Sequence, residues 1–192
     1  MPAATFPVTG DADADALLAK DPLALLIGML LDQQVPMEWA FKGPATLSGR
    51  LGGLDAAAIA AMDPDEFTEI CKAKPAIHRF PGSMAGRIQA LCTALVEDYD
   101  GDAAKVWKGV RSAQTLYDRL RALPGYGDEK TRIFIAILAK RFGKTPAGWE
   151  EVAAPFSDAS PRSVADISSP ETFAQVRAWK KEMKAKGKGK TD

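Results

Sequence analysis

Residues 123–127, with the sequence Leu-Pro-Gly-Tyr-Gly, have the composition of a tight turn that could bind an anion. Pro124 ends any preceding helix, because the residue before a proline is disfavoured in the α region. Gly125 and Gly127 permit unusual backbone angles and leave the main chain uncovered. The amides of such a turn can point outward together at the start of the next helix, where the helix dipole favours negative charge. The segment therefore predicts a phosphate contact, with an αα-hairpin that binds nothing as the alternative.

The overall composition limits the size and the class of the protein that contains this turn. The 192 residues are 46% hydrophobic and 26% charged, enough for one good-sized domain or two small lobes with a shared core. No apolar stretch reaches the roughly 20 residues of a membrane span, and no signal peptide is visible, so we expect a cytoplasmic or nucleoid-associated protein. Two cysteines, Cys71 and Cys92, and one histidine, His78, cannot form a four-cysteine iron–sulfur site or a histidine-based metal cluster.

Charge is distributed unevenly although the net charge is zero. Residues 1–70 hold 3 basic and 11 acidic side chains, a net of −8, whereas residues 71–192 hold 22 basic and 14 acidic, a net of +8. This asymmetry permits a basic face for a polyanion. Lysines crowd the end of the chain, where residues 184–192 are expected to form a disordered basic tail.

Helix signals recur along the chain and strand-like alternation is nearly absent, which predicts an all-α, two-lobed domain of about ten helices over residues 13–183, after a flexible start at 1–12. Asp21-Pro22 is a cap followed by a proline at the first helical position and predicts a helix to about Gln34. Ser83 is expected to cap a helix that ends near Tyr99. Helices over Thr115–Ala122 and Asp128–Phe142 flank the glycine turn, and Pro170 begins the last helix.

Three segments in this order resemble the helix-hairpin-helix/Gly-Pro-Asp superfamily of base-excision DNA glycosylases, which includes endonuclease III, the adenine-mismatch glycosylase and the 3-methyladenine glycosylases. The first is the apolar helix ending in Asp32-Gln33-Gln34, the second is Arg79-Phe80-Pro81-Gly82-Ser83 with the helix after it, and the third is the 123–127 turn with the apolar helix after it. Together they span about residues 21–156.

The resemblance implies double-stranded, damaged DNA as the partner and a monomer, with a monovalent cation as an alternative ligand of the hairpin. The count of two cysteines implies a member without an iron–sulfur cluster. The resemblance also implies that Gln34 fills the gap left by an extruded base, since flipping costs a few kcal/mol of unstacking. The implied DNA-binding residues are Leu123, Pro124, Gly125, Tyr126, Gly127, Lys130, Thr131, Gln33, Gln34 and Ser83. The implied base-pocket residues are Asp32, Trp39 and Trp149.

Two positions depart from the family pattern. Lyase-type members carry a lysine two residues after the second hairpin glycine, where this chain has Glu129, and a carboxylate cannot form a Schiff base. The family's catalytic aspartate also has no direct counterpart. Alignment on Phe142-Gly143 brings Glu150 to its place, with Glu151 and, less favoured, Asp158 as further candidates; the alternative is that the two glutamates decorate an exposed short helix.

The resulting hypothesis is a monofunctional glycosylase that hydrolyses the N-glycosidic bond of a damaged base without lyase activity. The first alternative is a non-catalytic helix-hairpin-helix DNA-binding protein that has lost the catalytic aspartate and lysine. The second is a helical scaffold for a protein partner. Steep salt dependence of duplex binding would separate the two DNA-binding classes from the scaffold.

Overall fold

The computed structural model describes residues 4–192, and the part of the expected flexible start at residues 1–3 lies outside it. The regular secondary structure of the described residues is helical, apart from one isolated bridge between Ser112 and Ala147, which confirms the all-α prediction. It forms ten α-helices and two 3₁₀ helices: α1 (Ala12–Lys20), α2 (Pro22–Leu31), α3 (Met37–Leu51), α4 (Ala56–Ala61), α5 (Pro64–Lys72), α6 (Pro81–Tyr99), η1 (Ala103–Val106), α7 (Ala113–Arg121), α8 (Asp128–Phe142), α9 (Trp149–Val152), η2 (Val164–Asp166) and α10 (Pro170–Ala185).

Helix α2 is the centre of the core. All its residues from Leu23 to Leu31 are buried, as expected of a helix that is apolar on every side. It packs against α1, α3, α6, α8 and η1. Gly28 allows α3 to approach closely, because a Cβ at this position would lie 2.7 Å from Phe41 Cδ1.

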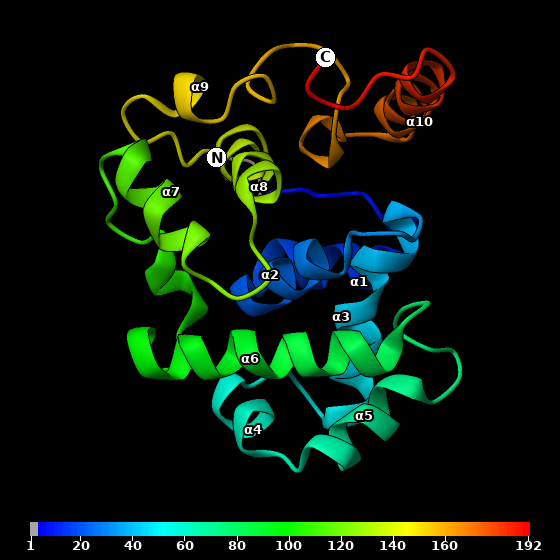
Figure 1. The fold of residues 1–192 in the computed structure, drawn as a ribbon, viewed down its shortest axis with the longest axis vertical. Coiled ribbons are helices and arrows are strands. Elements are labelled where there is room, and N and C mark those ends of the chain that lie inside the picture. Colours follow the sequence, from blue (N-terminus) through cyan, green and yellow to red (C-terminus); the bar gives the residue numbers. More distant parts are fainter. Residues whose placement is uncertain (1–3) are drawn as a thin grey trace.

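The remaining helices lie on two sides of α2 (Figure 1). Helix α6 crosses one end of the molecule with α4 and α5 packed beneath it. Helices α7, α8 and α9 lie toward the opposite end, where α10 is also found. The helices before and after the glycine turn therefore sit on the far side of α2 from α4 and α5.

Local signals set most helix starts. Asp21 accepts hydrogen bonds from the amides of Leu23 and Ala24, and Asp63 caps α5 in the same way. Ser169 caps α10 in a capping box with Thr172. Two predicted boundaries were wrong: Ser83 lies inside the first turn of α6, whose cap position is Phe80, and α2 ends at Leu31, before Gln34.

Both ends of the described chain are more ordered than the sequence suggested. Phe6 and Val8 are buried in the core, and the Phe6 ring packs edge-on against Phe41 with centroids 5.3 Å apart. At the other end, Arg162 Nη1 donates to the carbonyl oxygens of Lys190 and Asp192 at 3.1 and 2.7 Å. In the described residues 4–12 of the predicted flexible start, Phe6 and Val8 are held by burial. In the predicted disordered tail at 184–192, Lys190 and Asp192 are held by Arg162.

Among residues 4–192, none of the helices has the length and apolar character that crossing a membrane requires.

Candidate functional site

The glycine turn between α7 and α8 has the backbone geometry that anion binding requires. Gly125 has a φ of +87°, the Tyr126 amide donates to Leu123 O at 3.1 Å, and Gly127 occupies the cap position of α8 without a side-chain cap. Within residues 4–192, the amides of Gly127, Asp128 and Glu129 have no hydrogen-bond partner. These exposed donors at a helix N-terminus can be satisfied by one anionic oxygen ligand.

Three residues predicted to bind DNA are buried instead. Leu123 and Tyr126 belong to the hydrophobic core, and the Tyr126 hydroxyl donates to Leu26 O at 2.7 Å. Thr131 is fully buried, and its hydroxyl has no partner among the described atoms. The Tyr126 hydroxyl fixes the turn to α2. Because the side chains of Leu123 and Tyr126 are buried, any DNA contact at these positions must come from the backbone.

Lys130 also turns toward α2. Its Nζ donates to Met29 O and Leu30 O at 2.8 and 2.9 Å, which satisfies carbonyls at the C-terminal end of that helix. Burial lowers its pKa to about 8, against the opposing effect of the Asp32 charge. The expectation of a lysine directed at DNA is corrected, because this ammonium joins two helices. The contacts that Gly125, Tyr126 and Lys130 make with α2 are called the hairpin junction below.

Two carboxylates at the start of α8 are each matched by a basic group. Asp128 accepts from Tyr117 Oη at 2.6 Å and from Arg132 Nε at 3.0 Å; these bonds, the tyrosine first, lower its pKa. Glu129, at the position where lyases carry lysine, pairs with Lys190 Nζ at 3.2 Å. The acidic charge beside the turn is therefore largely compensated locally.

The loop after α2 holds its two glutamines differently. Gln33 is fixed: its Nε2 donates to Leu30 O at 2.8 Å, and its Oε1 accepts from Arg87 Nη1 at 3.0 Å. His78 Nε2 bonds Gln33 O at 2.8 Å, and because His78 Nδ1 accepts from the Phe80 amide, Nε2 is the donor. Gln34 is exposed with a φ of +60°. Of the two, only Gln34 is free to enter a duplex.

A cavity of about 550 Å³ opens beside this loop. Its size is in the range of sites that hold small ligands. Residues 32–38 form one wall, and the other wall comes from α10 and the chain end. The cavity-lining residues are Asp32, Gln33, Gln34, Val35, Pro36, Met37, Glu38, Arg177, Lys180, Lys184 and Lys190. Of the three predicted base-pocket residues, Asp32, Trp39 and Trp149, only Asp32 lines this cavity.

The other predicted residues lie elsewhere. Trp39 is half exposed and donates to Ala76 O at 2.9 Å, Trp149 packs partly against the core, and Ser83 is exposed on α6. None of the three lines the cavity.

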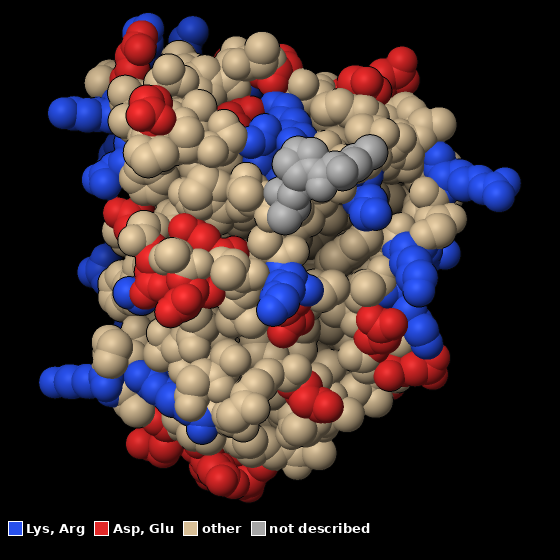
Figure 2. All heavy atoms as spheres, turned by 180° about the vertical axis from the view of Figure 1, so that it is seen from behind, with Lys and Arg blue, Asp and Glu red and all other residues tan. Residues whose placement is uncertain are grey.

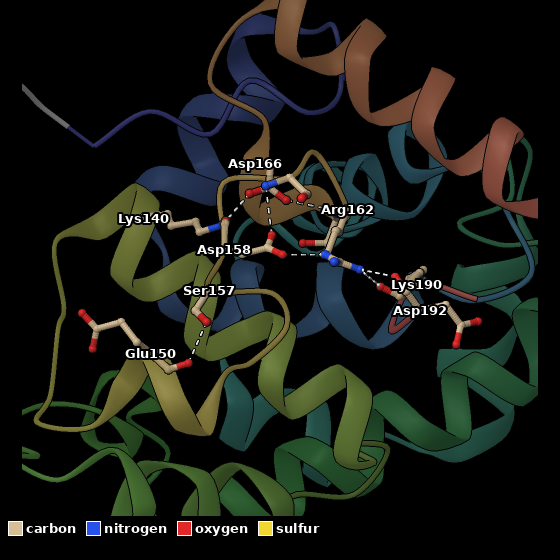
Figure 3. A network of polar contacts seen from close by, with 10 residues as sticks. Lys140, Glu150, Ser157, Asp158, Arg162, Asp166, Lys190 and Asp192 are labelled. Atoms are coloured by element: carbon tan, nitrogen blue, oxygen red, sulfur yellow. Dashed lines mark hydrogen bonds and ion pairs between the residues drawn. The ribbon is translucent and has the colours of Figure 1, made fainter. Parts of the chain in front are cut away.

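Glu150 and Glu151 lie on α9, away from the glutamine loop. The Glu150 carboxylate points away from the neighbouring polar network, and only its carbonyl takes part, accepting from Ser157 Oγ at 2.6 Å (Figure 3). Glu151 lines a separate groove with Gln114, Tyr117 and Arg132. Asp158 pairs with Arg162 at 2.9 Å. The structure therefore does not bring these candidate acids to the cavity.

The basic wall was not predicted as a site. Lys180, Lys184 and Lys190 come from a segment without a recognisable motif, and sequence reasoning treated its end as a disordered tail. The only available signal was the charge asymmetry between the two halves of the chain.

The cysteines do not suit a four-thiolate iron–sulfur cluster. Such a cluster needs four cysteine ligands, and this sequence has Cys71 on α5 and Cys92 on α6. Both are buried and free, and desolvation raises the pKa of each thiol to about 12.

Comparison with known proteins places the chain in a family. A family model described as "HhH-GPD superfamily base excision DNA repair protein" matches residues 27–190. Because the match covers most of the sequence, this protein belongs to the HhH-GPD superfamily of base-excision DNA repair proteins.

Two solved structures resemble the chain more distantly. They are a trapped endonuclease III–DNA covalent intermediate, an estranged-adenine complex, and a non-covalent endonuclease III–DNA complex, at 18% and 19% identity. Each has a TM-score of 0.46 and covers 86% of this chain, with 73% and 72% of the other chain covered. No curated protein matches the sequence.

Proposed function

We propose that this protein binds double-stranded DNA and acts as a monofunctional glycosylase, which hydrolyses the N-glycosidic bond of a damaged base. The observation that carries the proposal is the joining of two site elements. Lys130, on the helix after the glycine turn, bonds the carbonyls at the end of α2, directly before Asp32 and the glutamine loop. A phosphate at the turn and an extruded nucleotide beside Gln34 would thereby be held in one fixed relation.

The chemistry we propose centres on Asp32. In the reaction, the bond from the sugar C1′ to the base nitrogen breaks, water oxygen adds to C1′, and the base leaves with a proton. A carboxylate can stabilise the positive charge at the sugar or accept a proton from the water. Asp32 is the acid of the cavity wall nearest the glutamines, and its charge raises the pKa values of Lys130 and Lys180 against the effect of burial.

The proposal includes neither lyase activity nor a metal cofactor. Glu129 occupies the position of the lyase lysine and is paired with Lys190, so no free amine stands there. We further propose that the protein works as a monomer in the cytoplasm or on the nucleoid.

A panel of duplexes tests the function. The panel contains uracil, alkylated purines, oxidised bases and abasic sites, and the readout is release of free base. We expect release from at least one duplex by the wild type, loss in Asp32→Asn, and retention in Glu150→Gln and Glu151→Gln. Loss in Glu150→Gln or Glu151→Gln with full activity in Asp32→Asn would overturn the assignment of the acid.

The second candidate function is DNA binding without catalysis. It is favoured by the exposure of Glu150, whose carboxylate points away from the polar network around it (Figure 3). Salt-dependent duplex binding with no base release across the panel would establish this alternative. Absence of duplex binding would reject both functions and leave a helical scaffold.

A further inference from the structure

One wall of the cavity is basic. It is formed by Arg177, Lys180, Lys184 and Lys190 and is called the α10 wall. Its positive charge exceeds the negative charge of the loop that faces it. The loop carries two carboxylates, Asp32 and Glu38, whereas the wall carries four basic groups. This division places acid on the glutamine-loop side and base on the α10 side of one cavity.

Two of the four basic groups have partners. Arg177 Nη1 lies 3.3 Å from Glu38 Oε1, and Lys190 Nζ lies 3.2 Å from Glu129 Oε1. The amines of Lys180 and Lys184 form no hydrogen bond or ion pair with any residue from 4 to 192. These two lysines are therefore free to bind an external anion.

Lys180 differs from an ordinary surface lysine. Burial lowers its pKa, and the nearby Lys190 charge acts in the same direction, while Asp32 opposes them. A desolvated ammonium without a hydrogen-bond acceptor is unfavourable. An anionic oxygen in the cavity would relieve that cost.

The α10 wall is also held in place. Arg162 stacks over Trp179 with its guanidinium carbon 5.4 Å from the ring centroid, and it bonds the carbonyls of Lys190 and Asp192. Asp158 fixes the Arg162 guanidinium from the other side at 2.9 Å (Figure 3). The lysines are thus presented by a supported helix and turn, unlike those of a frayed end.

Lys180 and Lys184 are distinguished by lining one cavity together with Lys190. On the face seen in Figure 2, basic and acidic side chains are interspersed, so their fields largely cancel. The α10 wall, by contrast, adjoins the hairpin, because Lys190 reaches Glu129 in the first turn of α8.

We propose that the α10 wall binds a second backbone phosphate of the DNA, with Lys180 and Lys184 as its ligands, beside the phosphate held by the glycine turn. The inference rests on the proposed DNA binding and adds the C-terminal helix to that interface. Lysine acts on phosphate as a point charge, so this contact positions the strand without reading its sequence. Two phosphate contacts near the glutamine loop would fix the strand on which Gln34 acts.

The test is duplex affinity of the full chain measured against salt concentration, using a fluorescent duplex with a stable abasic-site analogue. Each lost phosphate contact reduces the slope of log K against log salt by about 0.9. We expect a reduction of about 0.9 in Lys184→Gln and about twice that in Lys180→Gln/Lys184→Gln. The matched control is Lys181→Gln, which removes the same charge from an exposed position of the same helix outside the cavity and should leave the slope unchanged.

The outcomes separate the two levels of the proposal. If the wild type binds with a steep slope and Lys184→Gln behaves as Lys181→Gln does, the α10 wall is not a phosphate site, and DNA binding through the turn stands. If the wild type does not bind duplex, the proposed function fails with it. Binding of poly-glutamate, but not of DNA, in a Lys184-dependent manner would instead indicate an acidic protein partner and overturn the proposal. Because Lys184 is exposed, the Lys184→Gln variant keeps the test decisive even if the Lys180→Gln/Lys184→Gln double variant does not fold.

Discussion

The hairpin junction and the α10 wall both carry residues that suit DNA binding, yet their side chains are used in opposite ways. At the hairpin junction, Tyr126 and Lys130 direct their polar groups inward to carbonyls of α2. At the α10 wall, Lys180 and Lys184 have no partner within residues 4–192. At the hairpin junction, the side chains therefore stabilise the fold, and only backbone amides are left to bind a ligand. At the α10 wall, the charged side chains themselves are available to bind one.

The largest effect should come from Tyr126, the bulkiest side chain of the hairpin junction. Tyr126→Ala removes a buried aromatic ring and should lower the free energy of unfolding by about 3–5 kcal/mol. Tyr126→Phe keeps the ring and loses the bond to Leu26 O, at a cost of about 1–3 kcal/mol. Urea unfolding measures both. Equal, small effects of the two variants would show that the ring is not a core element.

Substitution of Gly125 should give the next largest loss of stability. Gly125→Ala places a Cβ at φ +87° and 3.0 Å from Leu30 Cδ1, and we expect a loss of about 1–3 kcal/mol. Gly109→Ala is the matched control, because its φ is +73° with open space around the Cβ, and it isolates the backbone strain. Gly127→Ala meets neither obstacle and should be mild. A smaller loss for Gly125→Ala than for Gly109→Ala in urea unfolding would contradict close packing of the turn on α2.

The third effect, at Lys130, should appear as a pH dependence of the free energy of unfolding. Its pKa is about 8 in the folded protein and 10.5 when unperturbed, so between these values the unfolded chain binds more protons. The free energy of unfolding should therefore rise with pH in this window, by at most about 1.4 kcal/mol per pH unit. The measurement is the free energy of unfolding of the wild type minus that of Lys130→Met, from pH 7.5 to 10. The contributions of other titrating groups cancel in this difference. A difference that is independent of pH would mean that Lys130 is well solvated.

The smallest effect on stability is expected at the α10 wall. Lys184→Gln removes an exposed charge without a partner, so the melting temperature should match that of the wild type within error. Thermal unfolding followed by circular dichroism checks this, with Lys181→Gln alongside. A clear loss of stability in Lys184→Gln alone would show that the α10 wall, like the hairpin junction, serves the fold.

Helix positions were largely predictable from the sequence because their signals are local. A capping aspartate followed by proline marks α2 and α5, and the start of α8 at Asp128 follows from the glycine turn before it. Segments lacking such signals were misjudged. Phe6 and Val8 precede the first helix, yet both are buried, and the Phe6 ring packs against Phe41 of α3.

By itself the sequence determined the helical class, the glycine turn before α8 and the glutamate at position 129, since each depends on residue types at adjacent or fixed positions. Which side chains face a ligand was decided by the tertiary structure alone. Lys130 and Tyr126 reach carbonyls of α2 from about 100 residues away along the chain, and Lys180 lines the same cavity as Asp32. Such contacts depend on how helices pack, and helix packing brings together residues whose separation in sequence carries no signal.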